Sequence, residues 1–251
     1  MISAKDVCFS FPGRTVLDGL TIDIEDSLAT VIIGRSGIGK SVFLKCITGL
    51  LKPQGGSILI DGDEVVGANR AELLAIRQRV GMLFQEGALF DSMTVSENVA
   101  FPLIYHKSAT GKEIGRRVMS YLDLVGMRDN EHAMPQELSG GMKRKVALAR
   151  AMILEPRYLL YDEPTSGLDP ESAAIVESMI SRLQREKSIT SLVVTHDIDL
   201  TRYIADRIAL LEDGRISAQS GREEAFKKTS PIYEHFIESR ERIRAENGSQ
   251  S

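Results

Sequence analysis

A glycine-rich octapeptide near the N-terminus has the composition and spacing of a phosphate-binding loop. The segment Gly34-Arg35-Ser36-Gly37-Ile38-Gly39-Lys40-Ser41, with Val42 directly behind it, fits G-x-x-x-x-G-K-[ST] between an apolar strand pattern and a helical one. Glycines let backbone N–H groups turn toward phosphate oxygens, and the start of a helix adds positive dipole character. Lys40 would then contact the β- and γ-phosphates, and the Ser41 hydroxyl would ligate Mg²⁺. The loop therefore predicts a site for a magnesium-bound nucleoside triphosphate.

Two carboxylates end a second apolar strand pattern, Tyr158 to Tyr161. Asp162, at the carboxyl edge of the sheet, can hold Mg²⁺ directly or through water. Glu163 points elsewhere and can polarise an attacking water. Acidic residues also end strands for purely structural reasons, and Pro164 follows here. Beside a phosphate loop the catalytic interpretation is favoured, and it predicts hydrolysis of the triphosphate.

Two further polar residues follow predicted strands. Gln85 comes after Val80 to Phe84 and can reach a metal or a water, and His196 comes after Thr190 to Thr195 and can hydrogen-bond a γ-phosphate. Ligands of open α/β sheets bind at the carboxyl ends of the strands, where both residues are expected. For the base, Phe11 could stack on adenine with Val16 beneath it, although an aromatic residue in an N-terminal strand is more often part of the core.

A second glycine motif, Leu138-Ser139-Gly140-Gly141-Met142, precedes a helical pattern. Ser139 can cap that helix, and the two glycines leave backbone N–H groups bare for an anion. The motif lies about a hundred residues after the first loop, which already surrounds one side of a triphosphate. It therefore indicates either a second nucleotide or a second subunit, unless it is an ordinary helix start.

These residues need a framework, and the hydrophobic pattern predicts one. The opening of the chain indicates strands at Val7–Phe9, Leu20–Ile24, Leu28–Ile33 and Ser57–Ile60, with a helix at Ser41–Leu51. Residues 86–154 are mostly helical in pattern. Strand and helix then alternate through helices at Glu171–Glu186 and Ile198–Ala205, which predicts βαβ units and a parallel sheet. A hairpin around Asp213-Gly214 and a charged helix from Ser230 are expected to follow.

Composition limits the surroundings in which the chain works. The chain has 251 residues, a net charge of -4 and a pI near 5.7, so no basic excess supports nucleic-acid binding. Cys8 and Cys46 lack metal-type spacing and are expected to be buried free thiols, although a disulfide stays open. No signal peptide and no apolar run of the roughly 20 residues needed to span a bilayer are evident. Any membrane part would come from a partner.

The ordered set of motifs resembles the ATP-binding cassette (ABC) ATPases, from about Ile2 to Phe226. The resemblance implies ATP as the nucleotide, with Gly34–Ser41 as the Walker A loop and Asp162 and Glu163 as the Walker B pair. It implies that Gln85 is the Q-loop glutamine and His196 the switch histidine. Leu138 to Met142 would be the family signature, with Met142 where glutamine is usual, and Ser166-Gly167-Leu168-Asp169 the D-loop.

The same resemblance implies a fold and an assembly. The expected fold is an α/β P-loop NTPase core: a RecA-like lobe with a parallel sheet, an N-terminal antiparallel β subdomain and a helical signature subdomain at about 86–154. One domain would cover residues 1–229, with a partly disordered helical tail at 230–251. Two copies would meet head to tail, with each ATP between Lys40 of one copy and Ser139, Gly140 and Gly141 of the other. Asp169 of the D-loop would be a further ATP-binding residue.

A narrower resemblance concerns the segment from Gln85 to Leu103, which is very similar to the Mce/Mla branch of bacterial phospholipid transport ATPases. Gly34–Ser41 and Leu138–Arg144 look like the same branch. The resemblance implies an integral-membrane permease contacted through about Glu86–Leu103, an Mce-type lipid-binding protein in the same complex, and a position on the cytoplasmic face of the inner membrane.

Two alternatives stay open. The first is the ATPase of an importer for a small solute, which should not carry the Gly87–Phe90 sequence together with Met142. The second is a non-transport ABC protein acting on ribosomes or DNA; such proteins carry tandem cassettes or a long coiled-coil insertion, and this sequence has neither.

Overall fold

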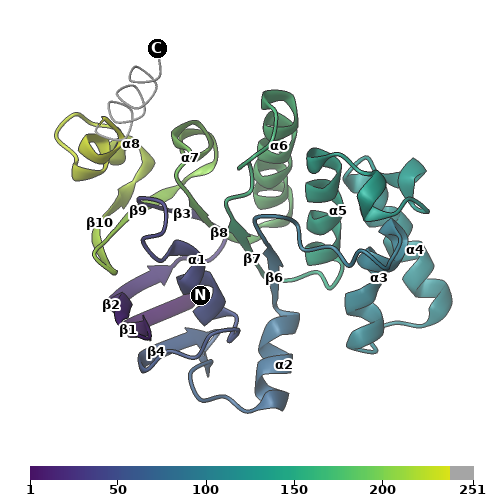
Figure 1. Ribbon diagram of the computed structural model, residues 1–251, viewed down its shortest axis with the longest axis horizontal. Coiled ribbons are helices and arrows are strands. Elements are labelled where there is room, and N and C mark those ends of the chain that lie inside the picture. Colours follow the sequence, from purple (N-terminus) through teal and green to yellow (C-terminus); the bar gives the residue numbers. More distant parts are fainter. Residues whose placement is uncertain (238–251) are drawn as a thin grey trace.

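Residues 1–237 are described by this computed structural model, and their strands form two sheets (Figure 1). The first is an antiparallel sheet with the order β2-β1-β4-β5. Its strands are β1 (Ile2–Phe11), β2 (Arg14–Ile24), β4 (Gly55–Ile60) and β5 (Asp63–Glu64). Along β1, Ile2, Ala4, Val7 and Phe9 are buried, because this sheet covers the core with one face only. The predicted N-terminal antiparallel subdomain is confirmed.

The second sheet has the order β10-β9-β3-β8-β7-β6. Its strands are β3 (Ala29–Ile33), β6 (Val80–Leu83), β7 (Tyr158–Asp162), β8 (Thr190–Thr195), β9 (Arg207–Glu212) and β10 (Arg215–Gly221). Only β10 pairs antiparallel, through the predicted hairpin with β9; the other pairings are parallel. Every residue of β3, β7 and β8 is buried, as expected for strands covered on both faces.

The register of the parallel strands fixes where the predicted site residues emerge. Ile33 pairs with Thr195, and Asp162 pairs with Val194. The phosphate loop, Glu163 and His196 therefore leave the sheet at one edge, and Gln85 leaves it there too, just after β6.

Helices α1 to α8 surround the sheets, and a further helix at residues 231–237 ends the described part of the chain. The labelled helices are α1 (Lys40–Ile47), α2 (Arg70–Gln78), α3 (Val95–Tyr105), α4 (Gly111–Leu124), α5 (Gly140–Met152), α6 (Pro170–Lys187), α7 (Ile198–Ile204) and α8 (Arg222–Ala225). Helices α3, α4 and α5 are grouped beyond the β6 edge of the parallel sheet, as the predicted helical subdomain requires (Figure 1). Within it, α3 begins with a capping box in which Thr94 and Glu97 satisfy each other's backbone N–H groups.

Two apolar cores lie on the two faces of the parallel sheet. Along β3, Val31 and Ile33 belong to one core and Ile32 to the other, as the two-residue alternation of a strand dictates. The chain after Ser230 begins with a helix at residues 231–237, whose Ile232 and Phe236 are buried in the first core. The predicted disorder of the tail concerns residues 238–251, which lie outside the described residues.

Three local features differ from the sequence interpretation. Helix α1 ends at Ile47 rather than Leu51, because Thr48 bonds back to Leu44 and Gly49 takes a left-handed backbone conformation. Helix α2 and the short strand β5 were not predicted from sequence. Ile76 is the one buried residue of Arg70–Gln78, so the segment has little of the buried apolar surface that marks a helix against a core.

Candidate ATP site

The phosphate-binding loop lies between β3 and α1 and is closed by its own lysine. The Lys40 ammonium donates to the carbonyl oxygens of Gly34, at 2.8 Å, and Arg35, at 3.2 Å. Gly39 has a φ of 123°, which favours glycine, and a Cβ there would lie 2.8 Å from a methyl of Val16. Val16 therefore packs against the phosphate-binding loop. Its predicted contact with the adenine base, beneath Phe11, stays a prediction.

The Ser41 hydroxyl and the Asp162 carboxylate come together at the start of α1 and the end of β7. Ser41 donates to Asp162 Oδ1 at 2.6 Å. Carboxylate and hydroxyl oxygens are ligands that suit Mg²⁺, which usually keeps several waters and takes phosphate oxygens as well. Within residues 1–237, no group of three or more His, Cys, Asp or Glu side chains could hold a metal. The two oxygens fit a magnesium ion that a bound triphosphate helps to coordinate.

Glu163 is the centre of a compact charged cluster. Its backbone has a φ of 46°, unusual for a residue with a side chain. One carboxylate oxygen lies 3.4 Å from the Lys40 ammonium. The other lies 3.0 Å from His196 Nδ1 and accepts a hydrogen bond of 3.0 Å from the Thr195 hydroxyl. The cluster joins the ends of β7 and β8 to the phosphate-binding loop.

Burial and pairing set the charges of this cluster. Burial alone would raise the pKa of Glu163, but the hydrogen bond from His196 and the charge of Lys40 bring it below its usual value. The hydrogen bond to Glu163 raises the pKa of His196. Burial lowers the pKa of Lys40 against the opposing pull of Glu163. Burial raises the pKa of Asp162, although the Ser41 hydroxyl counters it. The pKa values of the two neighbouring carboxylates are thus shifted in opposite directions, that of Glu163 down and that of Asp162 up.

A cavity of about 360 Å³ gathers most of the predicted site residues. Its lining includes Phe11, Val16, Ser36, Gly37, Gly39, Lys40, Ser41, Val42, Gln85, Glu163 and His196. Phe11 is 46% exposed and its ring contacts that of Phe9 in a T-shaped pair with centroids 5.0 Å apart. Residues as far apart in sequence as Phe11 and His196 thus share one cavity, whose size suits a ligand.

The second glycine motif and Asp169 lie outside this cavity. Ser139 caps α5 by accepting from the Met142 N–H, and Ser139 and Gly140 are exposed. Gly141 is buried, and a Cβ there would lie 2.6 Å from the Ser172 hydroxyl. Asp169 caps α6 by accepting from the Ser172 N–H. The two motifs are therefore neighbours in one chain, and the glycine at 141 is required by packing as well as by any anion.

Two residues of the site were missed from sequence. The Arg14 guanidinium donates to the Gly37 carbonyl oxygen at 3.0 Å and lines the cavity. Thr195 holds Glu163 through its hydroxyl. Thr195 directly precedes His196 at a strand end, so its position was a usable signal, whereas Arg14 in a polar turn carried none.

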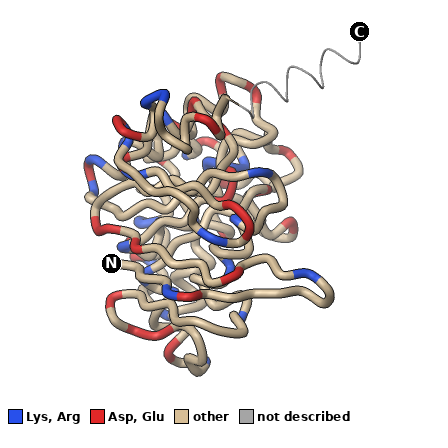
Figure 2. Tube along the Cα trace, turned by 90° about the vertical axis from the view of Figure 1, so that its left-hand side faces the viewer, with Lys and Arg blue, Asp and Glu red and all other residues tan. Residues whose placement is uncertain are grey.

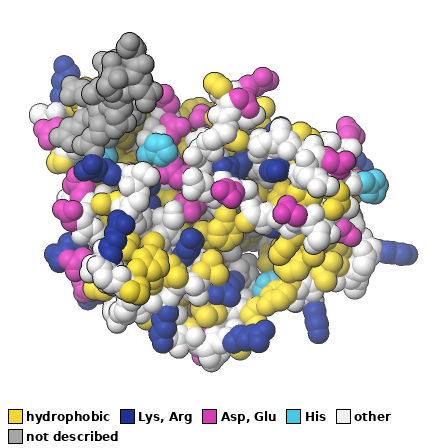
Figure 3. Space-filling model, viewed as in Figure 1, with side chains coloured by type: hydrophobic (Ala, Val, Ile, Leu, Met, Phe, Trp, Pro, Cys, Tyr) yellow, Lys and Arg dark blue, Asp and Glu magenta, His cyan; other side chains and the backbone are white. Residues whose placement is uncertain are grey.

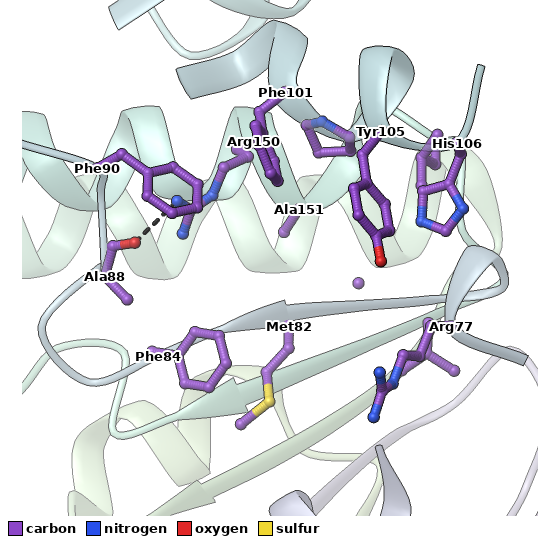
Figure 4. Close-up of a pocket in the computed structure, with 14 residues that line it drawn as sticks. Arg77, Met82, Phe84, Ala88, Phe90, Phe101, Tyr105, His106, Arg150 and Ala151 are labelled. Atoms are coloured by element: carbon purple, nitrogen blue, oxygen red, sulfur yellow. Dashed lines mark hydrogen bonds between the residues drawn. The ribbon is translucent and has the colours of Figure 1, made fainter. Parts of the chain in front are cut away.

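A second, apolar groove of about 330 Å³ lies between β6 and the helices α2, α3 and α5 (Figure 4). Space-filling shows apolar side chains gathered around this hollow (Figure 3). Its aromatic wall is a row in which Phe90 lies 4.7 Å from Phe101, and Phe101 stacks on Tyr105 at 5.9 Å. Along the Cα trace, basic and acidic residues are interspersed (Figure 2).

The groove is connected to the ATP site through hydrogen bonds. From α2, Arg77 donates to the Thr48 and Gly49 carbonyl oxygens just after α1, the helix whose first residues are Lys40 and Ser41. From α5, Arg150 donates to the carbonyl oxygens of Gly87 and Ala88, both at 2.8 Å, just after Gln85. Both ends of the groove are thus tied to segments that border the phosphate site.

The loop before α3 is fixed by one buried amide. Asn98 is fully buried and accepts from the Phe90 N–H at 2.8 Å. Its amide nitrogen donates to the carbonyl oxygens of Phe90, Met93 and Thr94. Phe90 is 41% exposed at this loop, while Leu89 is half-buried against the core. Of the two apolar residues, Phe90 is therefore the more exposed.

Comparison with known proteins places these features in context. The ABC transporter family model matches residues 17–166. The chain is 40% identical to the intermembrane phospholipid transport system ATP-binding protein MlaF of Haemophilus influenzae, over 89% of this chain and 85% of that protein. It is 37% identical to MlaF of Escherichia coli, over 95% and 88%. It is also 39% identical to the probable ribonucleotide transport ATP-binding protein mkl of Mycobacterium leprae, over 95% and 69%.

Solved structures give the same architecture. The ATP-binding cassette MJ0796, solved as a dimer in a post-hydrolysis state with ADP and Pi, superposes with a TM-score of 0.81 at 30% identity, over 88% of this chain and 99% of that one. Another match is cbiO1 from Clostridium perfringens, part of the transporter complex cbiONQ, with a TM-score of 0.81 and 30% identity over 93% of each chain.

Proposed function

This chain belongs to the ABC transporter family and is an ATP-hydrolysing subunit, and we propose that it energises phospholipid transport between the inner and outer membranes of a bacterium. The observation that carries the proposal is the 37–40% identity to MlaF proteins over 89–95% of the chain. Both comparisons include the segment from Gln85 to Leu103, which already resembled that branch.

The proposed ATP chemistry follows from the cavity. Backbone N–H groups of Gly34–Ser41 and the Lys40 ammonium hold the phosphates, while Phe11 and Val16 contact the base. Ser41, Asp162 and Gln85 would hold Mg²⁺, which would neutralise charge on the phosphate oxygens. Glu163 orients the attacking water, and His196 contacts the γ-phosphate. For this arrangement to form, Lys40 and His196 must break their contacts with Glu163 and contact the phosphates instead.

The proposed site is completed by a second copy. Ser139 and Gly140 are exposed at the start of α5 and lie outside the cavity that Lys40 lines. A nucleotide bound in that cavity would therefore leave them accessible to a nucleotide held by a second copy. Asp169, beside them, is exposed as well. In a head-to-tail pair the α5 helix start of one copy faces the triphosphate held by the other. The dimeric state of the MJ0796 cassette supports this arrangement.

The proposed permease contact is the apolar groove. The predicted contact segment, Glu86–Leu103, supplies Ala88, Phe90, Phe101 and Pro102 to its lining, and Tyr105 extends it. None of the helices among residues 1–237 combines the length and the apolar character that crossing a bilayer requires. A permease of the inner membrane, with an Mce-type lipid-binding protein in the same complex, would bind the chain from the membrane's cytoplasmic side.

A second candidate function has a specific observation in its favour. The mkl proteins, whose printed names describe probable ribonucleotide transport, are 39% identical over 95% of this chain. Their substrate would make this chain an importer subunit for a small solute. A bound substrate distinguishes the two functions directly, because a phospholipid and a ribonucleotide differ in mass, solubility and extraction.

The test is to isolate the complex that forms around the chain. A tagged Glu163→Gln chain, purified with Mg-ATP from native bacterial membranes, should carry a permease, and the complex should retain phospholipid by mass spectrometry. Retention of ribonucleotide instead would support the second function, and a ribosome in place of a permease would contradict both.

A matched pair of variants tests the groove. Phe90→Ser should leave folding of the isolated chain intact and reduce recruitment to membranes, because the ring is 41% exposed. Leu89→Ser should lower the melting temperature, because Leu89 packs against the core. Full recruitment and lipid movement with Phe90→Ser would place the permease contact elsewhere.

A further inference from the structure

Arg144 is buried on α5 between the two loops that border the ATP site. Its side chain is 5% exposed. Nη1 donates to the carbonyl oxygen of Phe84, the residue before Gln85, at 2.8 Å, and Nη2 donates to the carbonyl oxygen of Ser166 at 3.0 Å. Gln85 and Ser166 both line the cavity, and Arg144 does not. One guanidinium therefore joins the segment after β6 to the segment after β7 from behind the site.

The residue type suits this bridge. A guanidinium is planar and presents its N–H groups in a fixed fork, so it can hold two backbone carbonyl groups at a set separation, whereas an ammonium is a point donor. The Arg144 Nε is buried and has no hydrogen-bond partner among residues 1–237. Burying an arginine with one unsatisfied donor is unfavourable, and such a group calls for a reason other than stability.

The same helix carries the second glycine motif. Gly141, one turn before Arg144, packs against Ser172, and Gly140 lies against Leu168. The start of α5, the segment Ser166–Asp169 and the segment around Gln85 are thus held together by contacts from one helix.

We infer that Arg144 is a positioning residue of the ATPase reaction, which keeps the Gln85 segment and the Ser166–Asp169 segment at a fixed separation. The inference rests on the proposed roles of Gln85 and of the two-copy site. Arg144 should affect turnover rather than nucleotide binding. Among the hydrogen bonds of the described residues, none joins Arg144 to Lys40 or to the loop of Gly34–Ser41.

The experiment compares Arg144→Met with Arg117→Met in the isolated chain. Arg117 also donates to a backbone carbonyl, that of Ile153 at the other end of α5, at 3.1 Å, and it is far from the proposed machinery. With Arg144→Met, kcat should fall about 10–100-fold, as for loss of an outer-shell partner, and the KM for ATP should stay within about threefold. Amide hydrogen exchange should quicken at residues 84–86 and 166–169. Arg117→Met should change neither kcat nor exchange at those segments.

Arg144→Lys keeps the positive charge and tests the positioning role of Arg144 if the methionine variant does not fold. The lysine ammonium lacks the rigid planar fork by which the guanidinium holds both carbonyl groups at a set separation, so kcat should fall and exchange should rise in at least one segment. Parent-like kcat in a folded Arg144→Met or Arg144→Lys chain, measured below its melting temperature, would overturn the inference. These assays need no lipid, so failure of the transport proposal leaves their outcome unchanged.

Discussion

The Ser41 hydroxyl donates to the Asp162 carboxylate at 2.6 Å, although 121 residues separate the two in sequence. Parallel pairing makes this possible, because β3 and β7 flank β8 and end at the same edge of the sheet. The contact holds together two oxygens from the phosphate-binding loop and the acidic strand end. It also counters the rise in the pKa of Asp162 that burial produces.

Asp162→Asn should weaken magnesium dependence more than nucleotide binding. The amide keeps the size of the side chain and removes the negative charge that favours a hard cation. The Mg²⁺ concentration that gives half-maximal ATPase activity should rise at least 10–100-fold, about what loss of even an outer-shell partner costs. Asp197→Asn, at the end of β8, is the comparison, and an unchanged Mg²⁺ requirement for Asp162→Asn would remove Asp162 from the metal site.

Glu163→Gln should slow turnover by about 10²–10⁴-fold, the usual range for loss of a general base. Its nucleotide affinity should persist, because Lys40 and the loop of Gly34–Ser41 are unchanged. Steady-state ATPase assays and nucleotide titration measure the two effects separately. Glu86→Gln, an exposed neighbour of Gln85, serves as the control. A Glu163→Gln chain with near-normal turnover would exclude the role.

Lys40→Ala should remove most of the thermal stabilisation by Mg-ATP. At 100 times the dissociation constant, binding to the parent adds about 2.7 kcal/mol to the free energy of unfolding. The variant loses the cation that faces the phosphates, so its melting temperature should respond little to nucleotide. Lys45→Ala on the same helix should respond like the parent. Equal shifts for Lys40→Ala and the parent would mean that Lys40 is not a phosphate ligand.

The pair of His196 and Glu163 predicts a pH dependence of stability in the absence of nucleotide. The pKa of His196 is raised above 6.5, so its contribution is complete below that pH and is lost as pH rises through the folded value. The pKa of Glu163 is lowered below 4.5, so its contribution is complete above that pH and is lost as pH falls through the folded value. Both contributions are present between these limits.

His196→Gln should therefore melt below the parent by the largest margin between about pH 5 and 6. The histidine side chain is 59% exposed, so solvent screening limits the difference to about 2–4 °C. Thermal melts across pH 5 to 9 in the absence of nucleotide measure it. A margin that grows as pH rises would contradict the assignment of the pair.

The two-copy site makes association depend on ATP. Glu163→Gln with Mg-ATP should elute as a dimer, because the nucleotide is bound and turnover is slow. Adding Ser139→Arg should return it to a monomer, since a long cation at an exposed helix start blocks the facing copy. Sedimentation velocity measures both states.

The tail needs its own control in this experiment. Truncation at Ser230 would remove Ile232 and Phe236 from the core, so the chain should be cut after Ile237 instead. A dimer that ignores ATP and Ser139→Arg but disappears on this truncation would place the interface in the tail.

Much of the fold could be predicted because the strands of the parallel sheet are unbroken apolar runs. Thr190–Thr195 was predicted with its observed bounds, and β7 differed by one residue. Sequence gave less for Arg70–Gln78, whose helix is stabilised by a capping box at Asn69 rather than by a broad apolar face. The strand β5, two exposed residues long, has no periodicity to detect.

For the site, the order of motifs predicted which residues gather but not how they bond. Glu163, Lys40, His196 and Gln85 were expected at one edge, and they line one cavity. That Glu163 contacts both cations depends on its left-handed backbone conformation, which no local pattern signals. Arg144 was missed because a lysine- and arginine-rich helix start reads as a solvated face, and only tertiary packing shows which basic residue is buried.

The four hydrogen bonds of Asn98 have a consequence for how fast and how tightly a partner binds. The Phe90 loop is ordered during folding of the chain itself, so its conformational entropy is already lost before any encounter. A partner then meets a rigid template, and association should need no slow rearrangement. Asn98→Ala removes the hydrogen bonds that order the Phe90 loop, so it should weaken recruitment to membranes although Asn98 itself is fully buried.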